Sequence, residues 1–336
     1  MLTIAELVDR RLWGSDLAAE PLLVVDLDSA GDVAAAAGIS GRASVLVGVT
    51  RRTVLGPLAD TMDVVVSPVE QDDRRVVVGE IDALLASVDA GVSASPIAAV
   101  CLVALLRQTS VLPAELGLVA ESFAYSTLLA GPEHARWLAD RFPRPPRTTE
   151  PTAMVRVSRT GDTLDLALTD PDRRNAFGRR MRDELVEALA LLDADDSIRD
   201  VHIRGEGPAF SSGGDLDEFG TTPDPATAHL IRTVRSVAAR MEPHRNRIHV
   251  HVHGPCIGAG AELAAFGGHV SAAHDSEFRL PEVAMGLVPG AGGTVGITRR
   301  IGRWRTAYLA LSGAPLDAAT AHDWRLVDEV EGLGLP

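Results

Sequence analysis

Short apolar runs rich in β-branched residues mark the first half of the chain and alternate with stretches of helical character. The runs at 22–27, 44–49 and 63–69 have the length and composition of buried strands. Longer helical stretches follow from about 76 to 140. The pattern therefore predicts an N-terminal domain, residues 1–140, in which an α/β portion precedes a group of helices.

A proline-rich segment separates this half from the next. Residues 141–152, RFPRPPRTTEPT, hold four prolines and no apolar periodicity, which is the composition of a stiff linker. We place a domain boundary there and a second domain at 153–336. In that domain two strands about Thr160 and Gly161 precede a helix at 179–195. A strand at 201–207, a helix around 224–241 and a strand at 248–254 follow, so an α/β architecture is expected.

Charge and composition exclude several classes of partner. The formal net charge of −14 opposes binding to a nucleic-acid backbone, and all 32 basic residues are arginines, which excludes Schiff-base or P-loop chemistry on a lysine. Cys101 and Cys256 are too few for a disulfide framework or a thiolate zinc cluster. The chain has no apolar run long enough to span a membrane, and its N-terminus carries charges where a signal peptide would need an apolar stretch. We therefore expect a cytoplasmic protein without nucleic-acid or membrane partners.

Three histidines alternate along one of these strands. His249, His251 and His253 in IHVHVHG would share one face of the strand, an arrangement that can bind zinc. A metal-dependent hydrolase is therefore one alternative. We favour buried neutral histidines with hydrogen-bond partners, or histidines that face the N-terminal half, and predict no metal site.

Two glycine-rich loops and one acidic segment carry the candidate chemistry. The loops are GPAFSSGGDLDEF at 207–219 and GPCIGAGAELAAF at 254–266. Small residues at a strand-to-helix turn let backbone N–H groups approach a ligand, so two such loops could form an anion hole with two donors. The segment FRLPEVAMGLVPGAGGT at 278–294 places Glu282 between a proline and an apolar run. Partial desolvation there would raise its pKa and suit it to general acid or base catalysis.

The order and spacing of these segments resemble the crotonase (enoyl-CoA hydratase/isomerase) superfamily over about 153–330. AFSSGGDL resembles the first oxyanion loop, GAGAELA the second, and F-x-x-P-E followed by GLVPGAGGT the most distinctive run of the family. RRNAFGRRMRDEL at 173–185 is similar to the segment beside the coenzyme A arm. The resemblance implies an α/β fold with a crotonase-like ββα spiral core in the C-terminal half.

The resemblance also implies the site residues. It places the thioester oxygen between the backbone N–H groups of Gly214 and Ala259, each of which can stabilise a transition state by about 3 to 4 kcal/mol. It matches Glu262 and Glu282 to the paired glutamates with which hydratases move protons between water and the α-carbon. The substrate-binding positions that it implies are Ala176, Ser212, Asp215, Leu216, Asp217 and Gly290.

Two glutamates favour an enoyl-CoA hydratase, which adds water to a 2-enoyl-CoA thioester and needs no cofactor beyond the coenzyme A of its substrate. An isomerase, a decarboxylase or a thioester hydrolase of the same superfamily remains an alternative. A non-catalytic acyl-CoA-binding partner subunit is the alternative of a different class. The resemblance further implies a homotrimer or a dimer of trimers.

The N-terminal half also contains a weaker likeness. LVAESFAYSTLLAGPEHARWLADR at 118–141 is similar to the C-terminal tail of a crotonase chain, and helices of that tail are expected to be missing after position 330. We therefore interpret the N-terminal α/β-plus-helices domain as a degenerate crotonase copy, or as a displaced tail, whose helices replace the missing ones. An unrelated helical domain is the alternative.

Overall fold

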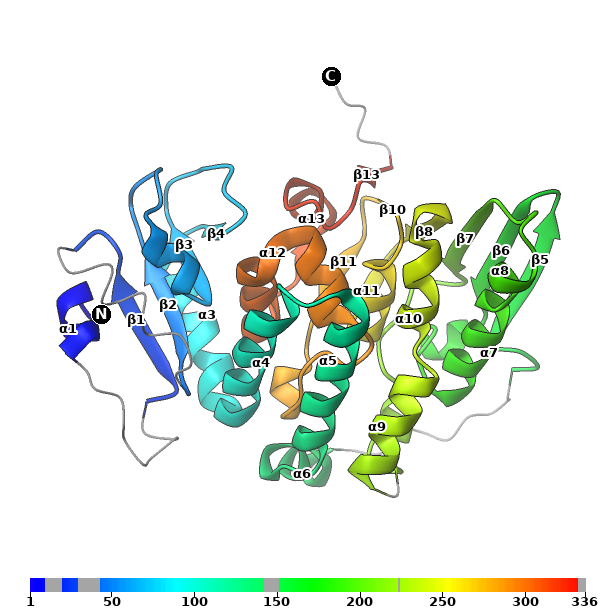
Figure 1. Ribbon diagram of the computed structural model, residues 1–336, viewed down its shortest axis with the longest axis horizontal. Coiled ribbons are helices and arrows are strands. Elements are labelled where there is room, and N and C mark those ends of the chain that lie inside the picture. The colour runs from blue at the N-terminus through cyan, green and yellow to red at the C-terminus, as the bar shows by residue number, and fades with distance from the viewer. Residues whose placement is uncertain (10–19, 30–42, 142–150, 223, 332–336) are drawn as a thin grey trace.

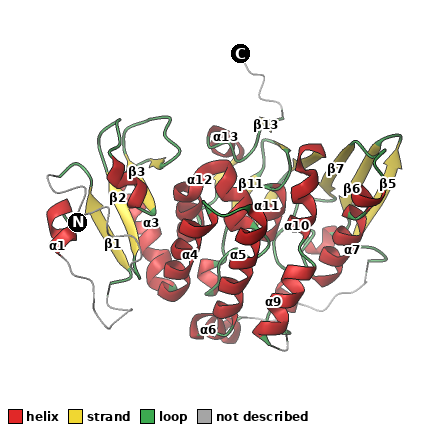
Figure 2. Ribbon diagram, viewed as in Figure 1, coloured by secondary structure: helices red, strands yellow, loops and turns green. Residues whose placement is uncertain are grey.

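The computed structural model describes residues 1–9, 20–29, 43–141, 151–222 and 224–331 (Figure 1). The architecture is mixed α/β. Figure 2 shows a sheet from the N-terminal half at one end of the molecule and the strands β5 (Val155–Thr160), β6 (Thr163–Leu168) and β7 (Asp200–Gly205) at the other. Most of the helices lie between these two sets of strands.

The N-terminal sheet is parallel, and its strands follow one another in sequence order. Its strands at Val45–Val49 and Val64–Ser67 are buried at every position, which explains why they form continuous apolar runs rather than alternating ones. The strands expected at 22–27, 44–49 and 63–69 are confirmed within a few residues, but a fourth strand begins the stretch expected to be helical. The elements are α1 (Ile4–Asp9), β1 (Leu22–Asp26), β2 (Val45–Val49), η1 (Pro57–Thr61), β3 (Val64–Ser67) and β4 (Val76–Val78).

Four helices complete this half: α3 (Ile81–Ala94), α4 (Pro96–Thr109), α5 (Ala114–Leu129) and α6 (Pro132–Asp140). The side chain of Glu80 caps α3 by accepting hydrogen bonds from two amides of its first turn. Prolines begin α4 and α6, at a position where the missing N–H costs no hydrogen bond. Among the described residues no single helix has the length and apolar character needed to cross a membrane, and only α3 and α4 together, across a bend of 111°, reach that composition.

The second half builds a six-stranded sheet of order β13-β10-β8-β7-β6-β5 and a three-stranded sheet of order β12-β11-β9. The strands β5 and β6 pair antiparallel about Gly161, whose φ of +64° suits a tight turn. Two helical stretches that the sequence analysis treated as continuous are each divided in two. The further elements are α7 (Arg179–Leu189), α8 (Leu191–Ala194), α9 (Pro225–Val234), α10 (Val237–Met241), β8 (Ile248–Val252), β9 (Pro255–Ile257), α11 (Ala259–Ala264), β10 (His269–Ala272), β11 (Glu277–Arg279), α12 (Gly293–Ser312), β12 (Leu316–Asp317), α13 (Ala318–Asp323) and β13 (Glu329–Val330), with 3-10 turns η2 (Pro171–Arg173), η3 (Leu216–Glu218), η4 (Glu242–Arg247) and η5 (Val283–Met285).

The two halves share one hydrophobic core. Buried residues of β2, β3 and α4 belong to the same cluster as those of β6, β7, β8 and α12, while a smaller cluster joins the N-terminal sheet to α1 and η1. Helix α12 packs against α3 and α4, and α5 packs against α9. At one crossing a Cβ on Gly91 would lie only 1.8 Å from the carbonyl oxygen of Leu311, so the helices approach as closely as a glycine allows. Residues 142–150 of the expected linker lie outside the described residues, and the division into two domains stays a prediction.

The histidine strand is β8, and its histidines lie on a sheet face. His249 stands between His202 of β7 and His269 of β10 in the strand register, on the side opposite the core residues of β8. No group of three or more His, Cys, Asp or Glu side chains in the described part of the chain could hold a metal ion. These histidines are half-buried rather than buried, and they contact neighbouring strands rather than the N-terminal half. The hydrogen bonds pair His202 Nδ1 with His251 Nε2 at 2.8 Å, His251 Nδ1 with Ser271 Oγ at 2.9 Å, and His253 Nε2 with Gly207 O at 2.9 Å.

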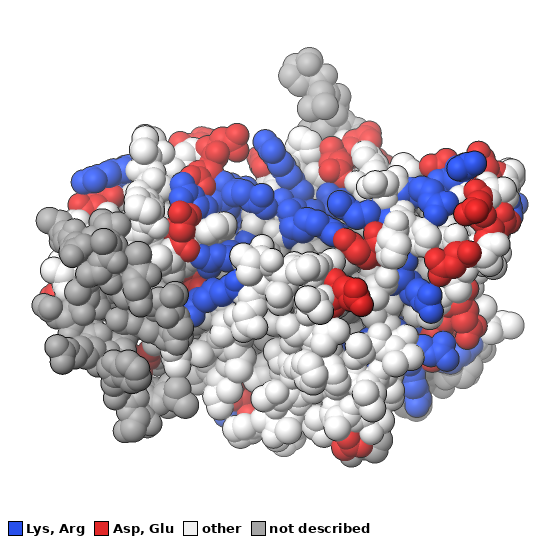
Figure 3. All heavy atoms as spheres, in the orientation of Figure 1, with Lys and Arg blue, Asp and Glu red and all other residues white. Residues whose placement is uncertain are grey.

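Charge is unevenly distributed over the surface. Figure 3 shows an area with few charged residues over α4, α5 and α9, and arginines gathered along its upper edge. Large apolar side chains are exposed on and beside these helices, among them Val111, Leu116, Phe123, Leu230 and Val234. This face therefore differs from the mixed charged surface beside the six-stranded sheet.

Candidate active site

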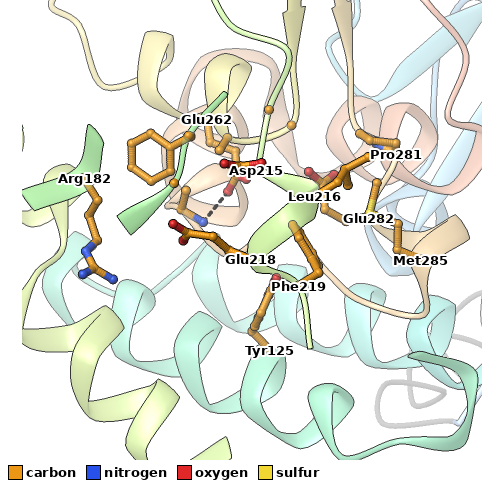
Figure 4. Close-up of a pocket in the computed structure, with 18 of the residues that line it drawn as sticks. Tyr125, Arg182, Asp215, Leu216, Glu218, Phe219, Glu262, Pro281, Glu282 and Met285 are labelled. Atoms are coloured by element: carbon orange, nitrogen blue, oxygen red, sulfur yellow. Dashed lines mark hydrogen bonds between the residues drawn. The ribbon is translucent and has the colours of Figure 1, made fainter. Parts of the chain in front are cut away.

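A cavity of about 330 Å³ lies between the loops of the second half and helix α5 of the first half. Both glycine loops and the segment 281–291 contribute to its walls, together with Tyr125 and Leu129 of α5. In Figure 4, Tyr125 points into the cavity from α5 below, and Glu262 enters from the opposite side. The three segments singled out in the sequence thus meet in one cavity, which an element from the other half completes.

The two glycine loops run side by side. Ser211 and Cys256 form an isolated parallel bridge, in which the N–H of Ile257 donates to the carbonyl oxygen of Ser211 at 2.9 Å. Three residues further along both segments lie Gly214 and Ala259, and both line the cavity. No acceptor among the described residues takes the backbone N–H of either. The two expected oxyanion donors are therefore neighbours on adjacent segments.

Positive φ angles allow this close approach. Gly213 has a φ of +88° and Gly258 a φ of +49°, a conformation that L side chains rarely adopt. A Cβ on Gly213 would lie 2.8 Å from the carbonyl oxygen of Ile257. Glycine is therefore required at these turns both by the backbone conformation and by the space between the loops.

Glu262 sits in the first turn of α11 with an exposed fraction of only 2%. Its Oε2 accepts hydrogen bonds from the backbone N–H groups of Ala291 and Gly293, each at 2.7 Å. Burial raises the pKa of Glu262 to about 7, although these hydrogen bonds work in the opposite direction. Oε2 of Glu262 is thus anchored to the main chain by two hydrogen bonds.

Glu282 follows Pro281 at the start of η5 and is 8% exposed. Its Oε2 is buried and has no hydrogen-bond partner among the described residues. Its Oε1 lies so close to the second glycine loop that a Cβ on Gly258 would be 2.4 Å away. Burial raises the pKa of Glu282 well above its usual range, and the negative charges of Glu262 and Glu121 raise it further. Glu282 therefore tends to keep a proton.

Glu121 of α5 is a third buried carboxyl group, 2% exposed, that the sequence analysis missed. Its Oε1 accepts from the N–H of Gly292 at 2.7 Å, and its Oε2 accepts from the N–H and the hydroxyl of Thr294 at 2.9 and 2.6 Å. Burial, and after it the charge of Glu262, raise the pKa of Glu121 to about 8 against these hydrogen bonds. Glu262 and Glu121 therefore hold alternate amides of residues 291–294.

The other expected site residues divide into two groups. Ser212, Asp215, Leu216 and Gly290 line the cavity, whereas Ala176 and Asp217 are not part of its wall. Ala176 is buried, and Oδ2 of Asp217 lies 3.7 Å from Nη2 of Arg173. Gly290 is held against Tyr125, because a Cβ there would lie 2.3 Å from the tyrosine ring. Three arginines that the sequence analysis did not single out also line the cavity: Arg179, Arg182 and Arg232.

Comparison with known proteins identifies the relatives of this chain. A family model described as enoyl-CoA hydratase/isomerase matches residues 161–332. The chain is 34% identical over 172 residues to 1,2-epoxyphenylacetyl-CoA isomerase of Escherichia coli K12, covering 50% of this chain and 65% of that protein. It is also 34% identical over 174 residues to 2,3-dehydroadipyl-CoA hydratase of the same organism, covering 52% of this chain and 68% of that protein. The chain thus spans about two thirds of the length of these curated relatives.

A solved structure is also similar. The crystal structure of enoyl-CoA hydratase from Thermoplasma volcanium GSS1 matches 53% of this chain and 72% of its own, with 33% identity and a TM-score of 0.48. The family model, at residues 161–332, covers both glycine loops, Glu262 and Glu282.

Proposed function

The chain belongs to the enoyl-CoA hydratase/isomerase family, and from that premise we propose that it adds water to a 2-enoyl-CoA thioester. The observation that carries the proposal is the pair of buried carboxyl groups, Glu262 and Glu282, in one cavity beside the two glycine loops. Both curated relatives described above are named for coenzyme A thioesters, which supports the substrate class.

The thioester carbonyl oxygen would accept hydrogen bonds from the backbone N–H groups of Gly214 and Ala259. Donors fixed before the reaction stabilise the negative charge that develops on this oxygen when water attacks the β-carbon. The π bond between the α- and β-carbons breaks, a C–O bond forms at the β-carbon, and a C–H bond forms at the α-carbon. One carboxylate takes a proton from the water and one carboxyl group supplies the proton at the α-carbon.

The surroundings of the two glutamates suit them to different roles. Two main-chain amides stabilise the ionised form of Glu262, which favours this residue as the base that takes the proton of water. Glu282 has no such donors at its Oε2, and nearby negative charge opposes its ionisation. It is therefore the better proton donor at the α-carbon. A pair of carboxyl groups whose pKa values are separated by their environments is the arrangement that acid–base chemistry near neutral pH requires.

Incubation with crotonyl-CoA tests the proposal. Hydration should remove the ultraviolet absorbance of the conjugated thioester and yield a product heavier by one water. Release of free coenzyme A would instead indicate hydrolysis, and a product of unchanged mass would indicate isomerisation.

Substitution of the two glutamates sharpens the test. Glu262→Gln and Glu282→Gln should each lower kcat/KM by about 10²- to 10⁴-fold, the usual contribution of a general acid or base. Glu187→Gln, on the exposed side of α7, is the matched control and should leave turnover unchanged. Unaltered turnover in either active-site variant, or no hydration of 2-enoyl-CoA thioesters of any chain length, would contradict the proposal.

A further inference from the structure

Arg232 of α9 lies in the cavity wall, against helix α5. Its guanidinium group stands 4.5 Å from the centre of the Tyr125 ring. Its Nε donates to Ser122 Oγ at 3.3 Å, and its Nη2 donates to Ser122 O at 3.3 Å and to Ser126 Oγ. These contacts fix the orientation of the side chain.

All of these partners are neutral. In the described part of the chain no carboxylate lies within ion-pair distance of Arg232, and Nη1 has no hydrogen-bond partner. Arg300 and Arg303, which are also withdrawn from water, each have an aspartate oxygen nearby, at 3.1 and 3.6 Å. Burial lowers the pKa of Arg232, and the charge of Glu121 opposes this shift without forming an ion pair. Arg232 is thus a partly desolvated cation without a carboxylate of its own.

Apolar side chains share the cavity wall with Arg232. Leu129, Phe177, Phe219 and Met285 are among them, and Tyr125 also lines the cavity. A purely apolar acyl group placed here would remove Arg232 and the tyrosine hydroxyl from water without replacing the lost hydrogen bonds, which is costly. A carboxylate would supply acceptors for both groups.

We propose that Arg232 binds a carboxylate at the distal end of the acyl group, so that the preferred substrates are 2-enoyl-CoA thioesters with a terminal carboxyl group. The inference rests on the proposed function, which places the thioester beside Gly214 and Ala259. The ring of Tyr125 packs on Gly290, next to the residues held by Glu262, and Arg232 stands on this ring. Tyr125 therefore stands between Arg232 and the segment that holds Glu262.

A purely structural role for Arg232 is the competing explanation, since it joins α5 to α9 through two serines. The two roles predict different kinetics. A clamp between helices would affect all substrates alike, whereas a carboxylate-binding residue affects only those with the carboxylate. The test therefore compares two six-carbon substrates, 2-hexenoyl-CoA and its terminally carboxylated counterpart, 5-carboxy-2-pentenoyl-CoA.

The wild-type protein should have a higher kcat/KM for the carboxylated substrate. Arg232→Met should lower the ratio of the two kcat/KM values by about 10- to 100-fold, the loss of a hydrogen bond between charged groups. Arg232→Lys keeps the charge without the planar fork and should give an intermediate ratio. Arg235→Met, an exposed arginine at the end of the same helix, should leave the ratio unchanged. No preference in the wild-type protein, or equal losses for both substrates in Arg232→Met, would overturn the inference.

Binding of saturated analogues separates this inference from the proposed function. Calorimetric titration with adipyl-CoA and hexanoyl-CoA should show tighter binding of adipyl-CoA, and Arg232→Met should abolish the difference. If that result comes with no hydration of any enoyl-CoA, carboxylate recognition stands and the hydratase function fails. If 2-hexenoyl-CoA is hydrated but adipyl-CoA has no advantage in binding, the function stands and the inference fails.

Discussion

The second half of the chain forms the candidate site through turns of the main chain, whereas the first half completes it through side chains of a single helix. Both glycine loops, Glu262 and Glu282 belong to the second half, within a short stretch of sequence. The first half supplies Glu121 and Tyr125 from α5, and the amide of Gly292 that Glu121 binds lies 171 residues further along. Sequence motifs therefore locate the chemistry, while the groups that support it can come from an element without any motif.

Loss of the Glu121 carboxylate is expected to have the largest effect on this arrangement. Glu121→Gln places an amide –NH₂ against the N–H groups of Gly292 and Thr294, so at least one buried donor loses its acceptor. Residues 291–294 should then shift, and with them Glu262. We expect kcat/KM for crotonyl-CoA to fall by about 10- to 100-fold, because small displacements of catalytic groups are costly.

The matched control for this substitution is Glu115→Gln, which alters an exposed glutamate in the first turn of the same helix. Its turnover should equal that of the wild-type protein. Assays well below the unfolding temperature of each variant separate a local change from unfolding. Full activity of Glu121→Gln would show that the first half serves only as a cover for the cavity.

An intermediate effect is expected where the halves pack most closely. Gly91→Ala would bring a methyl group against the carbonyl oxygen of Leu311, a main-chain atom that cannot rotate away. Overpacking of this kind lowers the free energy of unfolding by about 1 to 3 kcal/mol. Urea denaturation should detect the loss.

Gly56→Ala is the control, because a Cβ at Gly56 meets no atom within 4 Å and the φ of −76° is allowed for alanine. It should be neutral or slightly stabilising. Equal stability of the two alanine variants would mean that α3 and α12 can separate at little cost, and that the halves are less tightly joined than the shared core indicates.

The smallest expected effect is a shift in pH dependence. Turnover should fall at high pH as Glu282 loses its proton, and at low pH as Glu262 gains one. The charge of Glu121 contributes to the raised pKa of Glu282. Removing this charge in Glu121→Gln should lower the pKa of Glu282. The alkaline limb of the kcat/KM profile should then move to lower pH, by at most about one pH unit. A shift to higher pH would contradict this assignment of charges.

Much of the arrangement could be predicted because its signals are local. The strands β2 and β3 are buried on both faces, so each is a continuous run of apolar residues. The glycine loops have small residues wherever the two segments approach each other, and the family resemblance supplied the paired glutamates. Signals of this kind depend on neighbours in sequence.

The parts that were missed depend on distant neighbours. Nothing near Glu121 shows that its carboxylate is buried against residues 291–294, and Arg232 on a polar helix cannot be distinguished from an ordinary surface arginine. The strand β4 is only three residues long and lies just before a helix, so it is too short to show the alternating pattern that predicts a strand. Ala176 and Asp217 lie beside lining residues in sequence but outside the cavity wall, since Ala176 is buried and Asp217 lies near Arg173.

The hydrogen bonds between Glu121 and residues 292 and 294 also affect the order in which parts of the protein fold. A chain that emerges from the ribosome forms α5 long before these residues exist, so the carboxylate of Glu121 is solvated and ionised at first. When the second half docks, the N–H groups of Gly292 and Thr294 replace the water around this carboxylate. Completion of the site is therefore expected to be a late step in folding, because it requires residues 292 and 294 to reach α5.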